Sequence, residues 1–152
     1  MSEHLKRLIG EIGPALDLEA VLQVAEGREW ELVLAEGLSL RLEYEPSDDR
    51  LTLTGDIAPL GPSPSPDLLI QMLQYNSAST QTGGVRLALD ADLTAQQIYD
   101  TPAAGLALSD LKTIVLGLAD KIVAWQGALA GDPKPAPGEA PVASMDAYVF
   151  KI

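Results

Sequence analysis

The sequence predicts an α+β fold: amphipathic helices on a twisted antiparallel sheet, in the order α-β-β-β-α-β-β-α. Two patterns carry this prediction. Residues 30–54 alternate apolar and polar side chains between turn-forming residues, which is typical of an antiparallel meander with one buried face. Residues 109–129 instead place apolar side chains four and three positions apart, as in a helix with one buried stripe. At 152 residues, the chain is long enough for a domain with a substantial core.

The first residues predict a short helix. Ser2 can cap this helix, and Gly13–Pro14 is expected to end it. Its apolar side chains follow helical spacing: Leu5, Leu8, Ile9 and Ile12. Residues 15–25 fit either a strand or a helical turn, and the strand is favoured because Glu26–Arg28 would then reverse the chain.

The meander is predicted to contain three strands. Apolar residues alternate over residues 30–34, 38–44 and 51–54. Glu36-Gly37 and residues 46–49 supply the turn chemistry between these strands.

The central helix, expected over Asp67–Ala78, is apolar over more of its circumference than one packing surface requires. Six of the eight residues from Leu68 to Tyr75 are apolar. At 100° per residue they cover an arc of about 220°, whereas a helix that packs on a sheet needs about 100°. The surplus favours a homodimer built on this helix. The alternative is a helix wedged inside the core of one monomer.

The second half of the chain predicts two further strands, over residues 85–89 and 97–101, after a turn at Gly83-Gly84. Ser109 is expected to cap the long last helix. The domain prediction is therefore an α+β domain over residues 1–130, a Pro/Gly-rich linker over 131–141 and an apolar segment over 142–152. That last segment alternates at Tyr148, Phe150 and Ile152, which fits either docking on an apolar patch or sheet edge, or disorder.

Charge and composition exclude several classes of function. The chain has 22 acidic against 10 basic residues and a formal net charge of −12, which argues against nucleic acid and anionic membranes as partners. No apolar run approaches the ~20 residues of a membrane-spanning helix, and no signal-peptide pattern is present. Cysteine is absent, which rules out disulfides and thiolate chemistry. We expect a cytosolic protein.

Catalysis has little support in the residues, and no cofactor or metal is expected. The one histidine, His4, is expected to be a solvated surface group. Gly83-Gly84 is not followed by Lys-Ser/Thr, so it is not a phosphate loop. Asp90 and Asp92 could hold a hard cation, but solvated carboxylates at a strand end are favoured. Binding is better supported, because apolar grooves beside open sheet edges hold extended peptides.

The order of elements resembles that of the class I type III secretion chaperones, the Tir chaperone or CesT/SycE-like family. The resemblance covers roughly residues 2–130 and rests on a series of local phrases: Leu40–Glu45, Arg50–Thr54, Ala58–Gly61, Leu68–Asn76, Gly84–Asp90 and the closing helix Asp110–Trp125 with its late tryptophan. The small size and strong acidity of the chain agree with it.

The resemblance implies a cytosolic bacterial homodimer that binds the extended N-terminal region of a secreted effector without using a nucleotide. It implies a dimer interface at Leu68, Leu69, Met72, Leu73, Tyr75, Val85, Leu87 and Leu89. It implies client contacts at Leu5, Leu8, Ile9, Ile12, Trp30, Leu32 and Leu34. The alternative is a domain of the same fold with a non-secretory binding or regulatory role, such as an immunity-like inhibitor.

Overall fold

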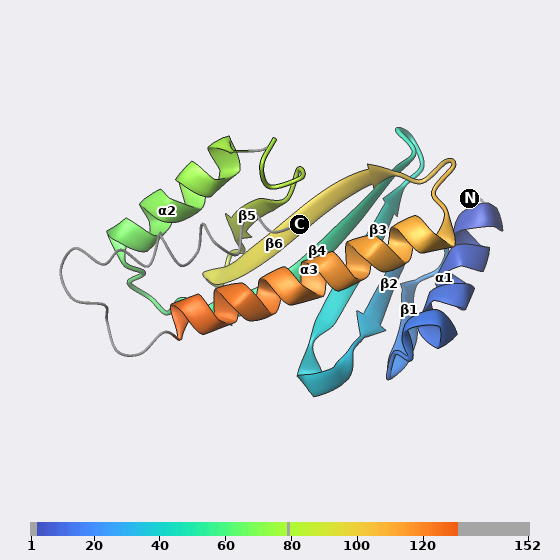
Figure 1. Cartoon of the computed structure of the whole chain (residues 1–152), viewed down its shortest axis with the longest axis horizontal. Helices are drawn as coiled ribbons and strands as arrows, with labels where there is room; N and C mark the ends of the chain where they lie inside the picture. The colour runs from blue at the N-terminus through green and yellow to red at the C-terminus, as the bar shows by residue number, and fades with distance from the viewer. Residues whose placement is uncertain (1–2, 79, 131–152) are drawn as a thin grey trace. The chain divides into compact units, whose positions relative to one another are not determined.

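The computed structural model describes residues 3–78 and 80–130 (Figure 1). It confirms the α+β class, with three helices and a six-stranded antiparallel sheet whose strands lie in the order β1-β2-β3-β4-β6-β5. Four strands precede the central helix, whereas the predicted order α-β-β-β-α-β-β-α has three; the additional strand is residues 20–25, for which the sequence favoured a strand over a helical turn. The predicted cap Ser2, the linker 131–141 and the apolar segment 142–152 lie outside the described residues.

The first helix, α1 (Glu3–Leu16), runs past the predicted stop at Gly13–Pro14. A proline removes one backbone donor, but in the last turn of a helix this does not prevent the turn from closing. The chain leaves the helix at Asp17, whose φ of 52° is left-handed, and the Leu18 N–H donates to the Gly13 carbonyl at 3.0 Å. This is the bonding pattern of a Schellman cap, so a left-handed residue ends the helix.

The meander begins with β1 (Ala20–Ala25), which confirms the strand interpretation for the second half of residues 15–25, whereas residues 15 and 16 belong to α1. It continues through β2 (Glu29–Val33), the single 3-10 turn η1 (Ala35–Gly37), β3 (Ser39–Glu45) and β4 (Arg50–Pro59). The predicted alternation is confirmed: every second side chain of β2, β3 and the first half of β4 is buried.

The remaining elements are α2 (Pro66–Ser77), β5 (Arg86–Leu89), β6 (Thr94–Pro102) and α3 (Leu108–Leu129). Ser109 does not cap α3, since it lies in the first turn and its carbonyl accepts the Thr113 hydroxyl at 2.9 Å. The carboxylate of Asp110 instead accepts the backbone N–H of Ala107 at 3.2 Å. An acid in the first turn satisfies a free donor of the helix start and suits the helix dipole.

Asp90 shapes the turn between β5 and β6. Its Oδ1 accepts the backbone N–H groups of Asp92 and Thr94, each at 2.9 Å, which organises the hairpin turn. Within residues 3–78 and 80–130, no group of three potential metal-ligating side chains comes together. In the same part of the chain, no helix has the length and apolar character needed to cross a membrane.

The chain divides into two compact units. Unit 1 holds the residues up to Gly55 together with Tyr99–Gly117, and unit 2 holds Asp56–Ile98 and the chain from Leu118 onward. Unit 1 therefore contains α1 and most of the meander, and unit 2 contains α2 and β5. The elements β4, β6 and α3 each contribute residues to both units.

Candidate functional site

The first candidate site is a groove in unit 1 between α1 and β1, with a volume of about 510 Å³. We call it the α1–β1 groove. Its lining comes from one face of α1 and from the neighbouring strands: Lys6, Ile9, Gly10, Gly13, Pro14, Val21, Gln23, Gly27 and Trp30. Polar and apolar groups contribute about equally to its walls, and Lys6 adds one cation to the lining.

Two glycines of α1 give the groove its shape. A Cβ atom added at Gly10 would meet no atom within 4 Å, so the missing side chain leaves open space. A Cβ atom at Gly13 would lie 3.1 Å from Cγ2 of Val21, so this glycine allows β1 to approach the helix closely. Both positions lie on the groove face of α1, and the groove exists because neither residue fills it.

Strand β1 borders the groove and is a terminal strand of the sheet. A terminal strand has unpaired backbone donors and acceptors along one side, which can pair with an added strand. Leu22 and Val24 are 48% and 58% exposed, whereas Val21 lines the groove. The register shifts between Gln23 and Ala25, so the strand carries a bulge. The edge therefore offers apolar side chains on both faces.

Acidic residues surround the outer face of this edge. In the sheet register Leu22 lies opposite Glu31, and Glu31 lies opposite Arg41. Glu29 and Glu43 lie directly opposite each other, an arrangement of like charges that disfavours an isolated sheet. Beside β1, the outer face of the sheet therefore carries three glutamates and one arginine.

The structure places all seven predicted client-binding residues among the buried side chains of the chain. Ile9 and Trp30 line the α1–β1 groove. The other five are buried and do not line the groove: Leu5, Leu8, Ile12, Leu32 and Leu34. Their contact with a client stays a prediction, and the directly accessible surface belongs to groove and edge residues that the sequence analysis did not select. In the sequence, the glycine at position 10, between the apolar positions of α1, was the one available sign of a groove on this helix.

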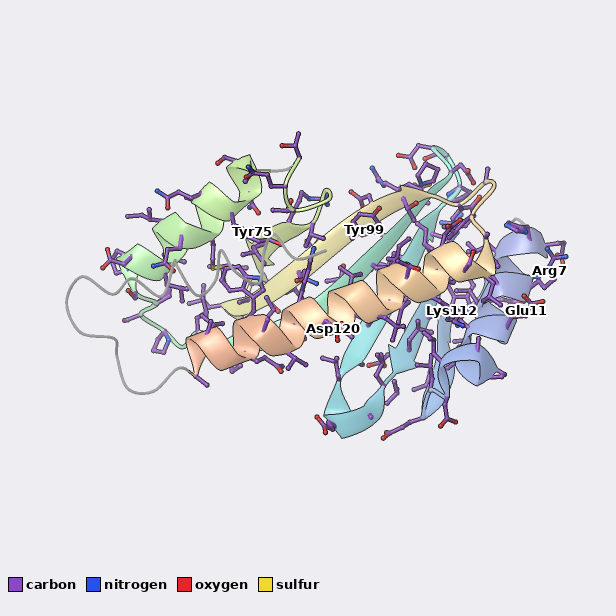
Figure 2. The ribbon with its side chains drawn as sticks, in the orientation of Figure 1. Arg7, Glu11, Tyr75, Tyr99, Lys112 and Asp120 are labelled. Carbon is purple, nitrogen blue, oxygen red and sulfur yellow. The ribbon has the colours of Figure 1, made fainter. Side chains whose placement is uncertain are left out.

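His4 is not a purely solvated group as predicted. Its Nε2 donates to the backbone carbonyl of Leu106 at 2.7 Å, and the Arg7 guanidinium donates to its Nδ1 at 3.3 Å. The imidazole therefore ties the start of α1 to the segment before α3. Arg7 itself points outward from α1, near Glu11 (Figure 2).

The second candidate site is the exposed side of α2. Leu73 is 70% and Ile70 is 51% exposed, although both are large apolar side chains. Leu69 lies one helical turn before Leu73 and is partly buried. We call these three residues the α2 apolar face. Its size agrees with the wide apolar arc that the sequence showed.

The predicted interface residues divide between this face and the interior of unit 2. Four of them are buried in the chain itself: Met72, Tyr75, Val85 and Leu87. Leu68, Leu69 and Leu89 are partly buried, and Leu73 is exposed. The dimer interface stays a prediction. Ile70, which the predicted set omitted, is an exposed apolar residue of the same helix.

Beneath α2, unit 2 buries several polar groups. Tyr75 packs edge-on against Trp125 with ring centroids 5.4 Å apart. Burial raises the pKa of Tyr75 to about 12, although the neighbouring Trp125 acts to lower this pKa. The Nζ of Lys121 donates to the Thr82 carbonyl at 3.2 Å, and burial lowers the pKa of Lys121 to about 8. The neutral forms of both side chains therefore suit this interior best.

The buried ammonium of Lys121 predicts a pH-dependent stability. Its pKa in the folded chain is about 8, below the ordinary value of 10.5, so above pH 8 the folded state releases this proton before the unfolded state does. Stability should then rise by about 2 kcal/mol between pH 7.5 and 9.5. Urea unfolding across this range should show the rise in the native chain. The Lys121→Met variant should lack it, and an equal rise in both proteins would contradict the prediction.

The arrangement places a partly apolar groove beside a terminal strand of the sheet. The family comparison agrees: residues 7–126 match the model of the Tir chaperone protein (CesT) family, so the chain belongs to that family. Among curated proteins, no sequence matches the chain.

Solved structures share the fold at low sequence identity. A chain of the ExsC–ExsE complex matches with a TM-score of 0.73 and 20% identity, over 88% of this chain and 100% of that chain. A chain of the HopA1–SchA chaperone–effector complex gives 0.63 and 21%, over 81% and 93%. The Yersinia pestis type III secretion chaperone SycH, solved with a stable fragment of YscM2, gives 0.62 and 20%, over 78% and 97%.

Proposed function

We propose that this protein is a homodimeric chaperone that binds the extended N-terminal region of a type III secretion effector and keeps it competent for secretion. Family membership and the likeness to chains from chaperone–effector complexes support this function. The observation that carries it is the α1–β1 groove beside the free β1 edge.

The proposed binding mode combines two sources of affinity. A client strand pairs its backbone with β1, and its alternate side chains enter the groove at Ile9, Val21 and Trp30. Backbone pairing tolerates many sequences, whereas the groove selects apolar side chains. An extended segment suits this site better than a folded domain, because only an extended chain presents a free edge and alternating side chains together.

Dimerisation is proposed to occur through the α2 apolar face. Contact between two copies would remove Ile70 and Leu73 from water on each side. In a twofold dimer the same patch meets itself, so one chain supplies both halves of the interface. We further propose a cytosolic location and a function without catalysis or a cofactor, which the family's role as chaperones supports.

Co-expression with a candidate effector tests the function. The effector should co-purify as a complex that survives gel filtration, and removal of the effector's N-terminal region should abolish the complex. The matched control is the same effector with an equally long deletion elsewhere. A complex that persists without the N-terminal region would contradict the proposal, and so would hydrolytic activity of the chain that one carboxylate substitution abolishes.

A further inference from the structure

We propose that Asn76 closes the outer edge of β5 in place of a partner strand, and so keeps a second copy of the chain from pairing with this edge. The strand β5 is a terminal strand of the sheet and has β6 as its neighbour. Such a strand pairs readily with another chain unless something covers or blocks its free side. The contacts that close it all lie within unit 2.

The pairing with β6 determines which backbone groups of β5 point outward. Asp90, which follows β5, donates its N–H to the carbonyl of Thr94 in β6 at 3.1 Å. In an antiparallel pair, every second residue exchanges hydrogen bonds with the partner strand. The residues between these positions therefore turn their N–H and C=O groups away from β6. They are Val85, Leu87 and Leu89.

Asn76 bonds the central one of these residues as a neighbouring strand would. It is partly buried and lies in the last turn of α2. Its Oδ1 accepts the N–H of Leu87 at 2.8 Å, and its Nδ2 donates to the Leu87 carbonyl at 2.9 Å. An antiparallel partner makes the same two bonds at each residue with which it exchanges them. Asparagine can make both bonds because its side-chain amide carries an acceptor and a donor side by side.

Thr82 closes the neighbouring outward position of β5. Its backbone carbonyl accepts the N–H of Val85 at 3.3 Å, and its hydroxyl donates to the Val85 carbonyl at 3.1 Å. Thr82 is completely buried, so an added strand would have to displace a packed residue. Two successive outward positions therefore have both of their backbone groups bonded within the chain.

The sequence of β5 suits pairing with itself, which is why the closure matters. In a twofold antiparallel pair centred on Leu87, the two copies of Leu87 would exchange the same two hydrogen bonds that Asn76 now makes. This register places Arg86 of one copy opposite Ala88 of the other. Arg86 is the one charged residue of the strand, so no like charges would face each other and oppose the pairing.

The closure leaves β1 as the terminal strand at which the sheet can be extended. Under the proposed function, a client strand therefore adds at β1, and copies of the chain meet through side chains, as at the α2 apolar face. This consequence rests on the proposed function, whereas the closure of β5 does not.

Removal of the side-chain amide tests the closure. At low concentration, the Leu87 amide of Asn76→Ala should exchange with solvent about tenfold faster or more, because its acceptor is gone. At high concentration, sedimentation velocity should show a species larger than that of the native chain, whatever the native state is. The control Gln74→Ala removes an exposed amide of the same helix and should behave as the native chain does. A folded Asn76→Ala variant that is no larger than the native chain would overturn the proposal.

A second substitution tests the register and separates strand pairing from a simple loss of stability. Added to Asn76→Ala, the change Ala88→Glu would bring opposite charges together across the pair, whereas Ala88→Arg would bring like charges together. Because each contact occurs twice about the twofold axis, the first double variant should associate about tenfold more tightly or more. Equal association of the two double variants would overturn the pairing. If Asn76→Ala does not fold, Asn76→Ser serves as the background, since serine is too short to bond both groups of Leu87.

Discussion

Replacing Leu73 with aspartate should convert the protein from a dimer to a monomer. Leu73 is 70% exposed in the single chain, and the proposed interface covers it in both copies. Burial of a leucine side chain is worth about 1.5–3 kcal/mol, and twofold symmetry counts each substitution twice. Two facing carboxylates add repulsion. The dissociation constant should rise at least 100-fold, as measured by light scattering over a concentration series.

The control for this experiment is Leu116→Asp, which makes the same change at an exposed leucine of α3, 48% exposed. This variant should stay dimeric. A native chain that is monomeric at micromolar concentration would contradict the proposed dimer, and loss of the dimer in both variants would place the interface elsewhere.

Replacing Gly10 with tryptophan should abolish client binding while the fold persists. A side chain at this position enters open space in the α1–β1 groove, so the indole competes with the client without displacing core atoms. Gly10→Ala should retain binding and gain up to about 1 kcal/mol of stability, because alanine favours a helix over glycine. Binding of an effector fragment by calorimetry and thermal unfolding measure the two effects separately.

The matched control is Gly127→Trp, which places the same side chain at an exposed glycine of α3 that also has no neighbour within 4 Å of the added Cβ. Its client affinity should equal that of the native chain. Unchanged affinity in Gly10→Trp would show that the client does not use the groove.

Much of the fold could be predicted because its signals are local. The alternation at Leu40, Leu42 and Tyr44 reports which side of a strand meets the core, and the structure buries those residues. The sequence also predicted that α2 has more apolar surface than one packing contact can cover, and in the structure Ile70 and Leu73 of this helix are exposed. These patterns hold because side-chain direction along a strand or a helix is set by backbone geometry.

The candidate site was harder to predict because tertiary packing decides which apolar residues remain accessible. Leu5 and Leu32 have the same local pattern as groove residues, but the packing of α1 against the sheet covers them completely. The groove depends on the missing side chains of Gly10 and Gly13, and a missing side chain leaves no repeating pattern in the sequence from which a groove could be predicted. The end of α1 was misplaced for a related reason. The left-handed residue Asp17 is not a glycine, and the preceding proline offered a stronger local signal.

The continuity of α3 has a consequence for cooperativity. The same helix buries Leu111 and Val115 in the residues of unit 1 and Ile122 and Trp125 in those of unit 2. Melting of the helix in either unit removes buried apolar surface from the other, since helix formation is cooperative along its length. We therefore expect the α1–β1 groove and the α2 apolar face to share one unfolding equilibrium. A substitution that melts α3 is therefore expected to remove the α1–β1 groove and the α2 apolar face in a single unfolding transition.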